Sequence, residues 1–181
     1  MKWRNTSTEW GGVTQIFHWG MFLLIVGQFT LAYTMIELPG SPQKMALYTW
    51  HKQMGLSLLF LVFLRLWWRK INPIPKESKI APPWDRVLSI ANIWILYILM
   101  FLMPLSGLLM SILGGHAVSY FDLFMIPLLM EGPNFYAKTF YITHVWSSYS
   151  LLAFTALHIL GGLYHHFIWK DTIFLRMFPH K

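Results

Sequence analysis

The sequence predicts an all-α integral membrane protein, a single domain over residues 1–181 built as a bundle of four transmembrane helices. Hydrophobic residues make up 56% of the chain and charged residues only 12%, whereas a soluble domain carries about 25% charged residues. Four apolar stretches are each long enough to cross a bilayer, which needs about 20 residues. This composition excludes a soluble globular domain and a disordered chain.

The four predicted helices cover residues 13–36, 45–70, 87–113 and 139–169. The apolar cores of the first, third and fourth contain no Asp, Glu, Lys or Arg, while the second includes His51, Lys52 and Arg65. The period-2 alternation of a membrane barrel is not observed, which favours helices. The first stretch is longer than the apolar core of a signal peptide, so we expect it to be retained as a helix.

The basic residues predict an orientation for these helices. Eleven of the 14 Lys and Arg residues precede the first helix, lie at or between the second and third, or follow the fourth. By the positive-inside rule, both termini and a Pro-rich loop at 71–86 lie in the cytoplasm, and a loop at 114–138 lies in the periplasm. The formal net charge of +7 therefore reflects topology, and nucleic-acid binding is not expected.

The chain has no cysteine, which excludes disulfides, iron–sulfur clusters and the covalent attachment of c-type haem. Metal or redox chemistry would therefore depend on its 8 histidines. Four of the histidines in the predicted helices, His18, His51, His144 and His158, are functional candidates, because a strongly polar side chain at membrane depth is costly. The last two are fourteen residues apart, which places them on one helix face about 21 Å apart along the axis.

Depth in the membrane predicts how these four histidines pair. His51 and His144 lie near the outer surface, and His18 and His158 lie near the inner one. Two imidazole pairs at two depths are typical of iron ligation in two b-type haems. For each histidine taken alone, a hydrogen-bonded interior residue or a proton relay remains the alternative. A zinc site would require three or four ligands at one depth.

Three charged residues lie near these predicted ligands. Arg65 follows His51 by fourteen residues on the same helix face, where we expect it to bind a haem propionate. The alternative is that Arg65 extends to the lipid headgroups. Lys52 and Lys138 flank the outer ligands, where their charge would steer an anion toward the outer haem. The alternative for both lysines is an ordinary position at the end of a membrane helix.

The end of the fourth helix predicts a second functional region. His165 lies on the same face as His158, about 10 Å nearer the cytoplasm. We expect a quinone to dock there, with Trp169 as an aromatic wall and the imidazole of His165 exchanging a proton. The alternative is that His165 compensates the helix dipole or binds lipid headgroups.

The chain resembles the bacterial cytochrome b561 family over essentially its whole length. The resemblance is carried by Ile16-Phe17-His18-Trp19, His51 through Gly55, Arg65, His144, His158 and the tail from His165 to Met177. It implies a four-helix protein of the bacterial inner membrane with two haem b groups, ligated by His18/His158 and His51/His144. The chain is most similar to the members that oxidise superoxide, which implies superoxide oxidation at the periplasmic face and ubiquinone reduction near the cytoplasm.

We therefore expect an oxidoreductase that transfers electrons across the membrane from superoxide to ubiquinone. The alternative is a membrane-anchor cytochrome b subunit, which passes electrons between quinone and a partner dehydrogenase or hydrogenase. A small proton-coupled transporter that uses the histidines as a relay is the non-redox alternative. An absorption spectrum with haem quantification separates the transporter from the two redox interpretations.

Overall fold

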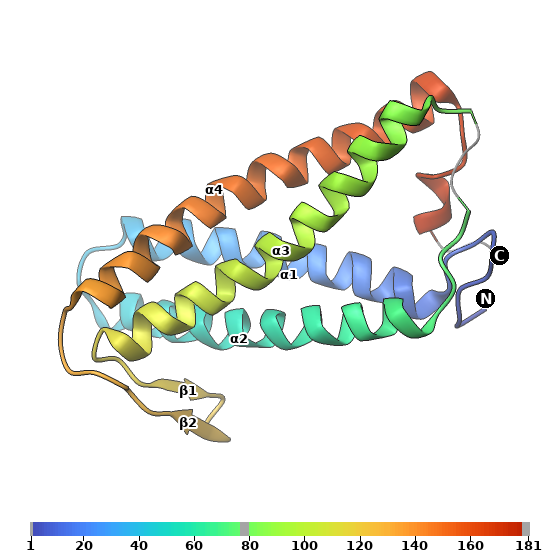
Figure 1. Cartoon of the computed structure of the whole chain (residues 1–181). Helices are drawn as coiled ribbons and strands as arrows, with labels where there is room; N and C mark the ends of the chain where they lie inside the picture. The colour runs from blue at the N-terminus through green and yellow to red at the C-terminus, as the bar shows by residue number, and fades with distance from the viewer. Residues whose placement is uncertain (1, 77–79, 179–181) are drawn as a thin grey trace.

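The computed structural model describes residues 2–76 and 80–178, so Lys79 and Lys181, used above for orientation, lie outside the described residues. Most of the described chain forms four long helices (Figure 1), namely α1 Gly12–Glu37, α2 Pro42–Ile71, α3 Pro83–Leu113 and α4 Phe135–Tyr164. α4 continues into a π-helical turn, η1 His165–Trp169, and a 3-10 turn, η2 Leu175–Met177, follows it. The fold is therefore mostly helical, as predicted.

Local capping explains where three of the helices begin. Ser41 Oγ accepts a hydrogen bond from Lys44 N at the start of α2, and Asn134 Oδ1 accepts one from Ala137 N at the start of α4. Prolines stand in the first turn of α2 and α3, where a missing N–H costs nothing. These helices begin three or four residues before the ranges predicted from hydropathy alone.

The helices are arranged as two antiparallel pairs (Figure 1). α1 packs along α2, α3 packs along α4, and α2 also contacts α3. The α3–α4 pair diverges from the α1–α2 pair toward the end that carries both chain termini, which we call the inner end. Among the described residues, α4 makes almost no close backbone approach to α1 or α2. Contacts between α4 and those two helices therefore depend on side chains.

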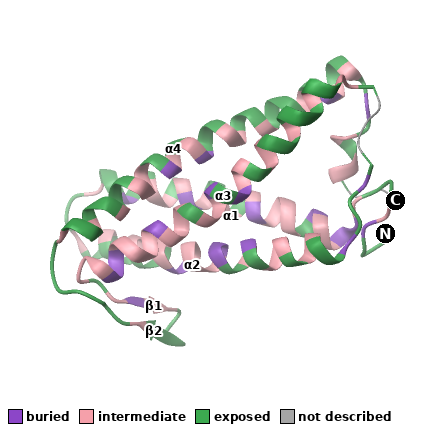
Figure 2. Ribbon diagram, viewed as in Figure 1, coloured by how far each residue is buried: buried purple, intermediate pink, exposed green. Residues whose placement is uncertain are grey.

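A cluster of buried apolar residues lies where α1, α2 and α3 meet and consists of Met21, Leu58, Val62 and Tyr97. Elsewhere large apolar side chains face outward, and much of the outer surface of the helices is exposed (Figure 2). Among the described residues, three helical segments are long and apolar enough to cross a membrane: Gly12–Glu37, Pro83–Leu113 and Phe135–Trp169. The remaining predicted span corresponds to α2. This helix is equally long but carries five Lys and Arg residues, so it stays a prediction that α2 crosses the membrane.

The connection between α3 and α4 contains a hairpin that the sequence did not predict. Strands β1 Val118–Tyr120 and β2 Phe124–Ile126 pair antiparallel, with Tyr120 opposite Phe124. The Tyr120 hydroxyl and Ser57 Oγ are 3.1 Å apart, so the hairpin folds back against α2. Three-residue strands inside an apolar segment are too short to produce a recognisable alternation.

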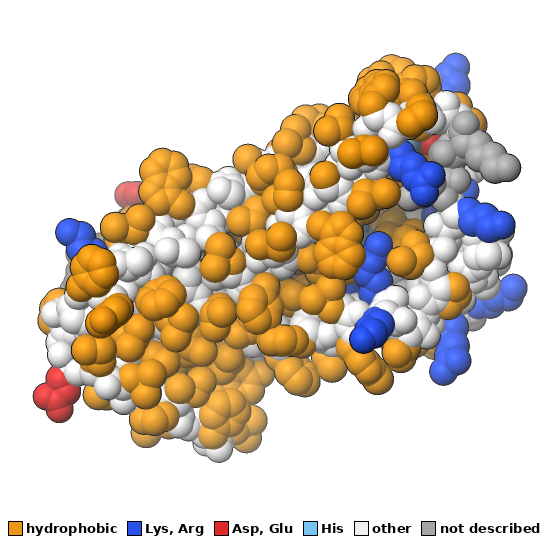
Figure 3. Space-filling view, in the orientation of Figure 1, with side chains coloured by type: hydrophobic (Ala, Val, Ile, Leu, Met, Phe, Trp, Pro, Cys, Tyr) orange, Lys and Arg blue, Asp and Glu red, His pale blue; other side chains and the backbone are white. Residues whose placement is uncertain are grey.

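The C-terminal tail, residues 171–178, follows η1 and lies against the start of α1 at the inner end (Figure 1). Trp19 Nε1 donates to the carbonyl oxygen of Met177 over 2.8 Å, and Gln15 Nε2 donates to the carbonyls of Arg176 and Phe178. Lys and Arg side chains gather at this end of the molecule (Figure 3). The hydrogen bonds of the tail therefore connect α1 with the end of α4, at the end where the two helix pairs diverge.

Candidate functional site

The structure brings the four helix-borne histidines together as two pairs. The ring centroids of His51 on α2 and His144 on α4 are 6.2 Å apart, and we call these two residues the outer pair. The ring centroids of His18 on α1 and His158 on α4 are 6.0 Å apart, and these form the inner pair. These are the partners expected from the depth of each residue along its helix.

The register of α4 explains why it contributes one ring to each pair. His144 and His158 lie on the same side of the helix as Ser147 and Leu151, the two buried residues of α4. Spacings of three, seven and fourteen residues return to nearly the same face of an α-helix. Because the α4 backbone stays away from α1 and α2, its imidazoles span the intervening space.

The distance between the paired rings fits two ligands on opposite sides of one metal ion. A metal–imidazole nitrogen bond is about 2 Å long, which places two opposed ring centroids about 6 Å apart. The observed separations are 6.2 and 6.0 Å. Within residues 2–76 and 80–178, no three His, Cys, Asp or Glu side chains are arranged so that they alone could hold a metal ion. Two imidazoles per site suit a haem, whose macrocycle supplies the remaining ligands.

His144 of the outer pair is held by α3. Its Nδ1 lies 2.7 Å from the carbonyl oxygen of Met103, so Nδ1–H donates there and Nε2 keeps its lone pair for a metal. A Cβ on Gly107 would lie 2.8 Å from His144 Cε1, closer than real contacts allow. Sequence reasoning missed both residues, because a backbone acceptor and a glycine inside an apolar helix have no distinctive signal.

Arg65 and Tyr97 lie beside the inner pair. Arg65 Nη2 is 3.3 Å from His18 Nδ1, and Arg65 Nε donates to the Tyr97 hydroxyl over 3.2 Å. A guanidinium can only donate, so His18 Nδ1 is the acceptor here. Ligation of iron through His18 Nε2 would put the proton on Nδ1, and Arg65 would then release the ring. Its donors would become free for an anionic group such as a propionate.

His165 lies at the inner end, in η1, and is buried between two carboxylates. Its Nδ1 forms a hydrogen bond of 2.7 Å with Asp171 Oδ2. Its Nε2 lies 2.9 Å from Asp85 Oδ2, although the geometry is not that of an aligned hydrogen bond. Both ring nitrogens of His165 therefore face carboxylates. The sequence analysis did not predict that these two aspartates contact His165. For Asp85 the reason is that only the fold brings it to His165, which lies eighty positions later in the chain.

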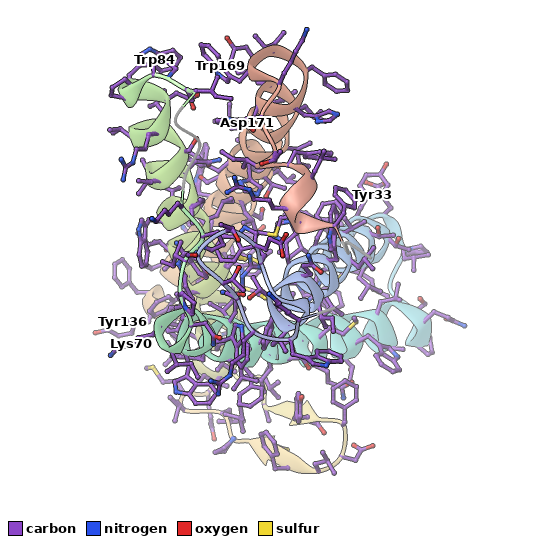
Figure 4. The ribbon with its side chains drawn as sticks, turned by 90° about the vertical axis from the view of Figure 1, so that its right-hand side faces the viewer. Tyr33, Lys70, Trp84, Tyr136, Trp169 and Asp171 are labelled. Carbon is purple, nitrogen blue, oxygen red and sulfur yellow. The ribbon has the colours of Figure 1, made fainter. Side chains whose placement is uncertain are left out.

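Trp169 lies at the same end of the bundle as Asp171 and Trp84 (Figure 4). Its ring packs edge-on against Tyr164 at 5.9 Å between centroids. Its Nε1 is buried and has no acceptor among the described residues. An indole N–H normally finds a partner when buried, so this donor is available to a ligand.

The two predicted outer cations differ in their surroundings. Lys52 is half-buried and directly follows His51 on α2. Lys138 lies in the first turns of α4 and lines an open pocket of about 420 Å³ together with His116 and Tyr141. Tyr141 precedes His144 by three residues, so the pocket lies about one helical turn outward of the outer pair.

The family profile and the similar proteins found by comparison all indicate one family. The profile of the family described as prokaryotic cytochrome b561 matches residues 9–180. The chain is 30% identical over 184 residues to cytochrome b561 homolog 2 of Escherichia coli (strain K12), covering 98% of this chain and 95% of that protein. It is 28% identical over 171 residues to the probable superoxide oxidase CybB of Yersinia pestis, with coverages of 91% and 92%. It is also 26% identical over 175 residues to cytochrome b561 homolog 1 of Escherichia coli (strain K12), with coverages of 93% and 96%.

Proposed function

This chain belongs to the prokaryotic cytochrome b561 family, and from that premise we propose that it oxidises superoxide on the periplasmic side of the inner membrane and reduces ubiquinone near the cytoplasm. Membership implies a membrane protein that binds b-type haem and transfers electrons. The observation that carries the finer proposal is the presence of two histidine pairs, 6.2 and 6.0 Å between centroids, at two levels of one helix.

In this proposal each pair holds one haem b. Haem b, when bound, supplies a one-electron carrier that alternates between the ferric and ferrous states. His51 and His144 are the ligands of the outer haem, and His18 and His158 are those of the inner haem. Met103 fixes the tautomer of His144 through the hydrogen bond to Nδ1, as supporting groups of metal-bound histidines commonly do. Arg65 binds a propionate once it has released His18.

α2 is the remaining membrane span in this proposal, because Arg65, the charged residue farthest inside its apolar stretch, turns toward polar partners inside the bundle. Arg65 contacts His18 and Tyr97, and Lys52 is half-buried beside the outer pair. Charged side chains within membrane spans usually face the bundle interior in this way. Four spans put both termini on one side, and the basic residues at that end (Figure 3) assign it to the cytoplasm.

The electron donor in this proposal is superoxide, which loses one electron and leaves as dioxygen. Lys52 and Lys138 supply positive charge at the outer end, which raises the local concentration of a small anion. The pocket beside Lys138 opens about one helical turn outward of His144, which supports access from that end. A relative over nine-tenths of the chain carries the name probable superoxide oxidase, which supports the same choice.

The electron acceptor in this proposal is ubiquinone, which takes up two electrons and two protons. The haems carry only electrons, so the protons must come from groups near the inner end. We assign the quinone contact to Trp169, whose buried N–H has no acceptor in the described part of the chain. Proton exchange is assigned to His165 with Asp85 and Asp171, which form a short chain of ionisable groups. Two superoxide ions are consumed for each quinol formed.

The deciding experiment is to purify the whole chain in detergent, quantify its haem, and then supply superoxide and a soluble ubiquinone. We expect two b haems per chain and quinol formation that stops when superoxide dismutase is added. Haem-loaded protein that copurifies with a large subunit and shows no turnover alone would instead indicate the membrane-anchor function. A colourless, folded protein would contradict both redox functions and favour a transporter.

A further inference from the structure

The two carboxylates on either side of His165 contact its ring in different ways. On one side, Nδ1 forms a hydrogen bond of 2.7 Å with Asp171 Oδ2. On the other side, Nε2 lies 2.9 Å from Asp85 Oδ2 without the alignment of a hydrogen bond. Contacts between catalytic groups are often poorly aligned in a free protein and tighten when substrate binds. The ring is thus bonded to Asp171, while it only faces Asp85.

Asp171 is the fixed carboxylate of the two. Its side chain is 3% exposed, and its Oδ1 accepts a hydrogen bond from Ile173 N over 3.0 Å. Its backbone N–H donates to the carbonyl oxygen of His165, so backbone and side chain both tie Asp171 to the histidine. A carboxylate bonded to Nδ1 of a histidine fixes the tautomer and the orientation of the ring. This side of the ring is therefore set, and its proton is held in place.

The two contacts of His165 together require two protons. A neutral imidazole carries one N–H, which the bond to Asp171 uses. Nε2 would then present a lone pair to a carboxylate oxygen at 2.9 Å, so that two acceptors would face each other in a buried place. A proton on Nε2 or on Asp85 Oδ2 removes this conflict. The contact between His165 and Asp85 is therefore suited to hold one further proton.

Asp85 is the member of this cluster with the most exposed side chain. The exposed fraction is 14% for Asp85, 8% for His165 and 3% for Asp171. Asp85 stands in the first turn of α3 and directly follows the exposed Trp84. Trp84 lies at the same end of the bundle as Trp169 and Asp171 (Figure 4). Water at the inner end can therefore reach the further proton through Asp85 more readily than through Asp171.

We propose that His165 and Asp85 share one exchangeable proton, which passes to quinone and is replaced from water through Asp85. The inference rests on the proposed reduction of quinone at the inner end. Trp169, assigned there to the quinone contact, follows His165 by four residues in η1. Each quinol formed takes two electrons, which arrive through the haems, and two protons, so the pair is reloaded from water after each delivery. Asp171 is a positioning residue and does not exchange its proton.

The test is stopped-flow reoxidation of the haems by a soluble ubiquinone, in the purified full chain reduced beforehand, so that superoxide is not needed. We expect Asp85→Asn to slow reoxidation about 100-fold, the usual contribution of a group that transfers protons. Haem content and spectra should stay those of the wild type, and deuterium oxide should slow the variant more than the wild type. Asp85→Glu, which keeps an acid, should retain most of the rate.

Chemical rescue separates proton exchange from a structural role. Asp85→Ala leaves space beside the exposed edge of the cluster, so acetic acid added at constant pH should restore its rate in proportion to the concentration. Asp171→Ala should be slow because the ring loses its orientation, but its buried site should not respond to added acid. Glu9→Gln is the matched control, because it removes an exposed acid of the N-terminal segment. It should keep the wild-type rate.

Three results would overturn the inference: a wild-type rate in Asp85→Asn, a slow Asp85→Ala protein that acid does not restore, or equal slowing in Glu9→Gln. Equal restoration of Asp171→Ala by acid would overturn the separate role of Asp171. If Asp85→Ala does not fold, the two other variants decide, and equally slow Asp85→Asn and Asp85→Glu proteins contradict the inference. Wild-type haems that ubiquinone does not reoxidise would instead refute the proposed function.

Discussion

The carbonyl oxygen of Met103 and Nδ1 of His144 are 2.7 Å apart, so the backbone of α3 holds an imidazole of α4. The same carbonyl accepts a hydrogen bond from Ser106 Oγ over 2.8 Å. The bond fixes both the tautomer and the ring orientation of His144. The close packing of α3 with α4 thus sets up one half of the outer pair, while the other half comes from α2.

Replacing one histidine of α4 should remove one haem and spare the other. We expect about two haems per wild-type chain and about one in His144→Ala and in His158→Ala, because the pairs share no residue. Pyridine haemochrome assays and reduced-minus-oxidised spectra measure this. If either substitution removed both haems from a folded protein, the two sites could not be independent.

Gly107→Ala should disturb the outer site selectively. The new Cβ would lie 2.8 Å from His144 Cε1, so the ring must move and lose its bond to Met103. We expect outer haem binding to weaken by about 10-fold or more, seen as loss of one haem during purification. Gly27→Ala is the control, because a Cβ there meets nothing within 4 Å. Equal haem contents in the two variants would contradict the assigned role of Gly107.

Both chain ends should lie in the cytoplasm, since they occupy the same end of the bundle and basic residues gather there. A fluorescent protein fused to the C-terminus should fluoresce, and an alkaline phosphatase fused there should be inactive. A phosphatase inserted at Asp122, in the hairpin turn, should be active. The reverse pattern would exchange the assignments of outer and inner haem.

His165→Ala should slow reoxidation of the haems by quinone while leaving both haem spectra and their reduction by the donor intact. The reason is that His165 contacts Asp85 and Asp171 rather than either histidine pair. His166, whose ring packs against Phe167 and Phe174, is the control and should have the smaller effect. Stopped-flow spectroscopy gives both rates. Equal slowing in the two variants, or a bleached haem, would refute the proton-exchange role.

Helix periodicity made it possible to predict from the sequence which histidines face each other. The partners of His144 and His158 follow from two rules, namely that fourteen residues return to the same helix face and that depth sets which residues meet. The resemblance to the cytochrome b561 family is likewise confirmed. Hydropathy located the four helices, but their first turns depend on caps such as Ser41 and Asn134.

Features that depend on tertiary contacts escaped prediction. The hairpin turns through Phe121 and Asp122 at φ 48° and 57°, where glycine or asparagine would have been the usual signal. The contact between Asp85 and His165 joins the start of α3 to the end of α4. No spacing rule relates residues so distant in sequence, because only the packing of the two helices brings them together.

The C-terminal tail also sets an order of assembly. A chain is made from its N-terminus, so residues 171–178 are made after α1 to α4. The bonds that Gln15 and Trp19 donate to tail carbonyls therefore become available only after every helix has been synthesised. Until then nothing from the tail bridges α1 and α4 at the inner end. The contacts that tie α1 to the segment following α4 are therefore among the last that the described part of the chain can form, after the four long helices are able to pack.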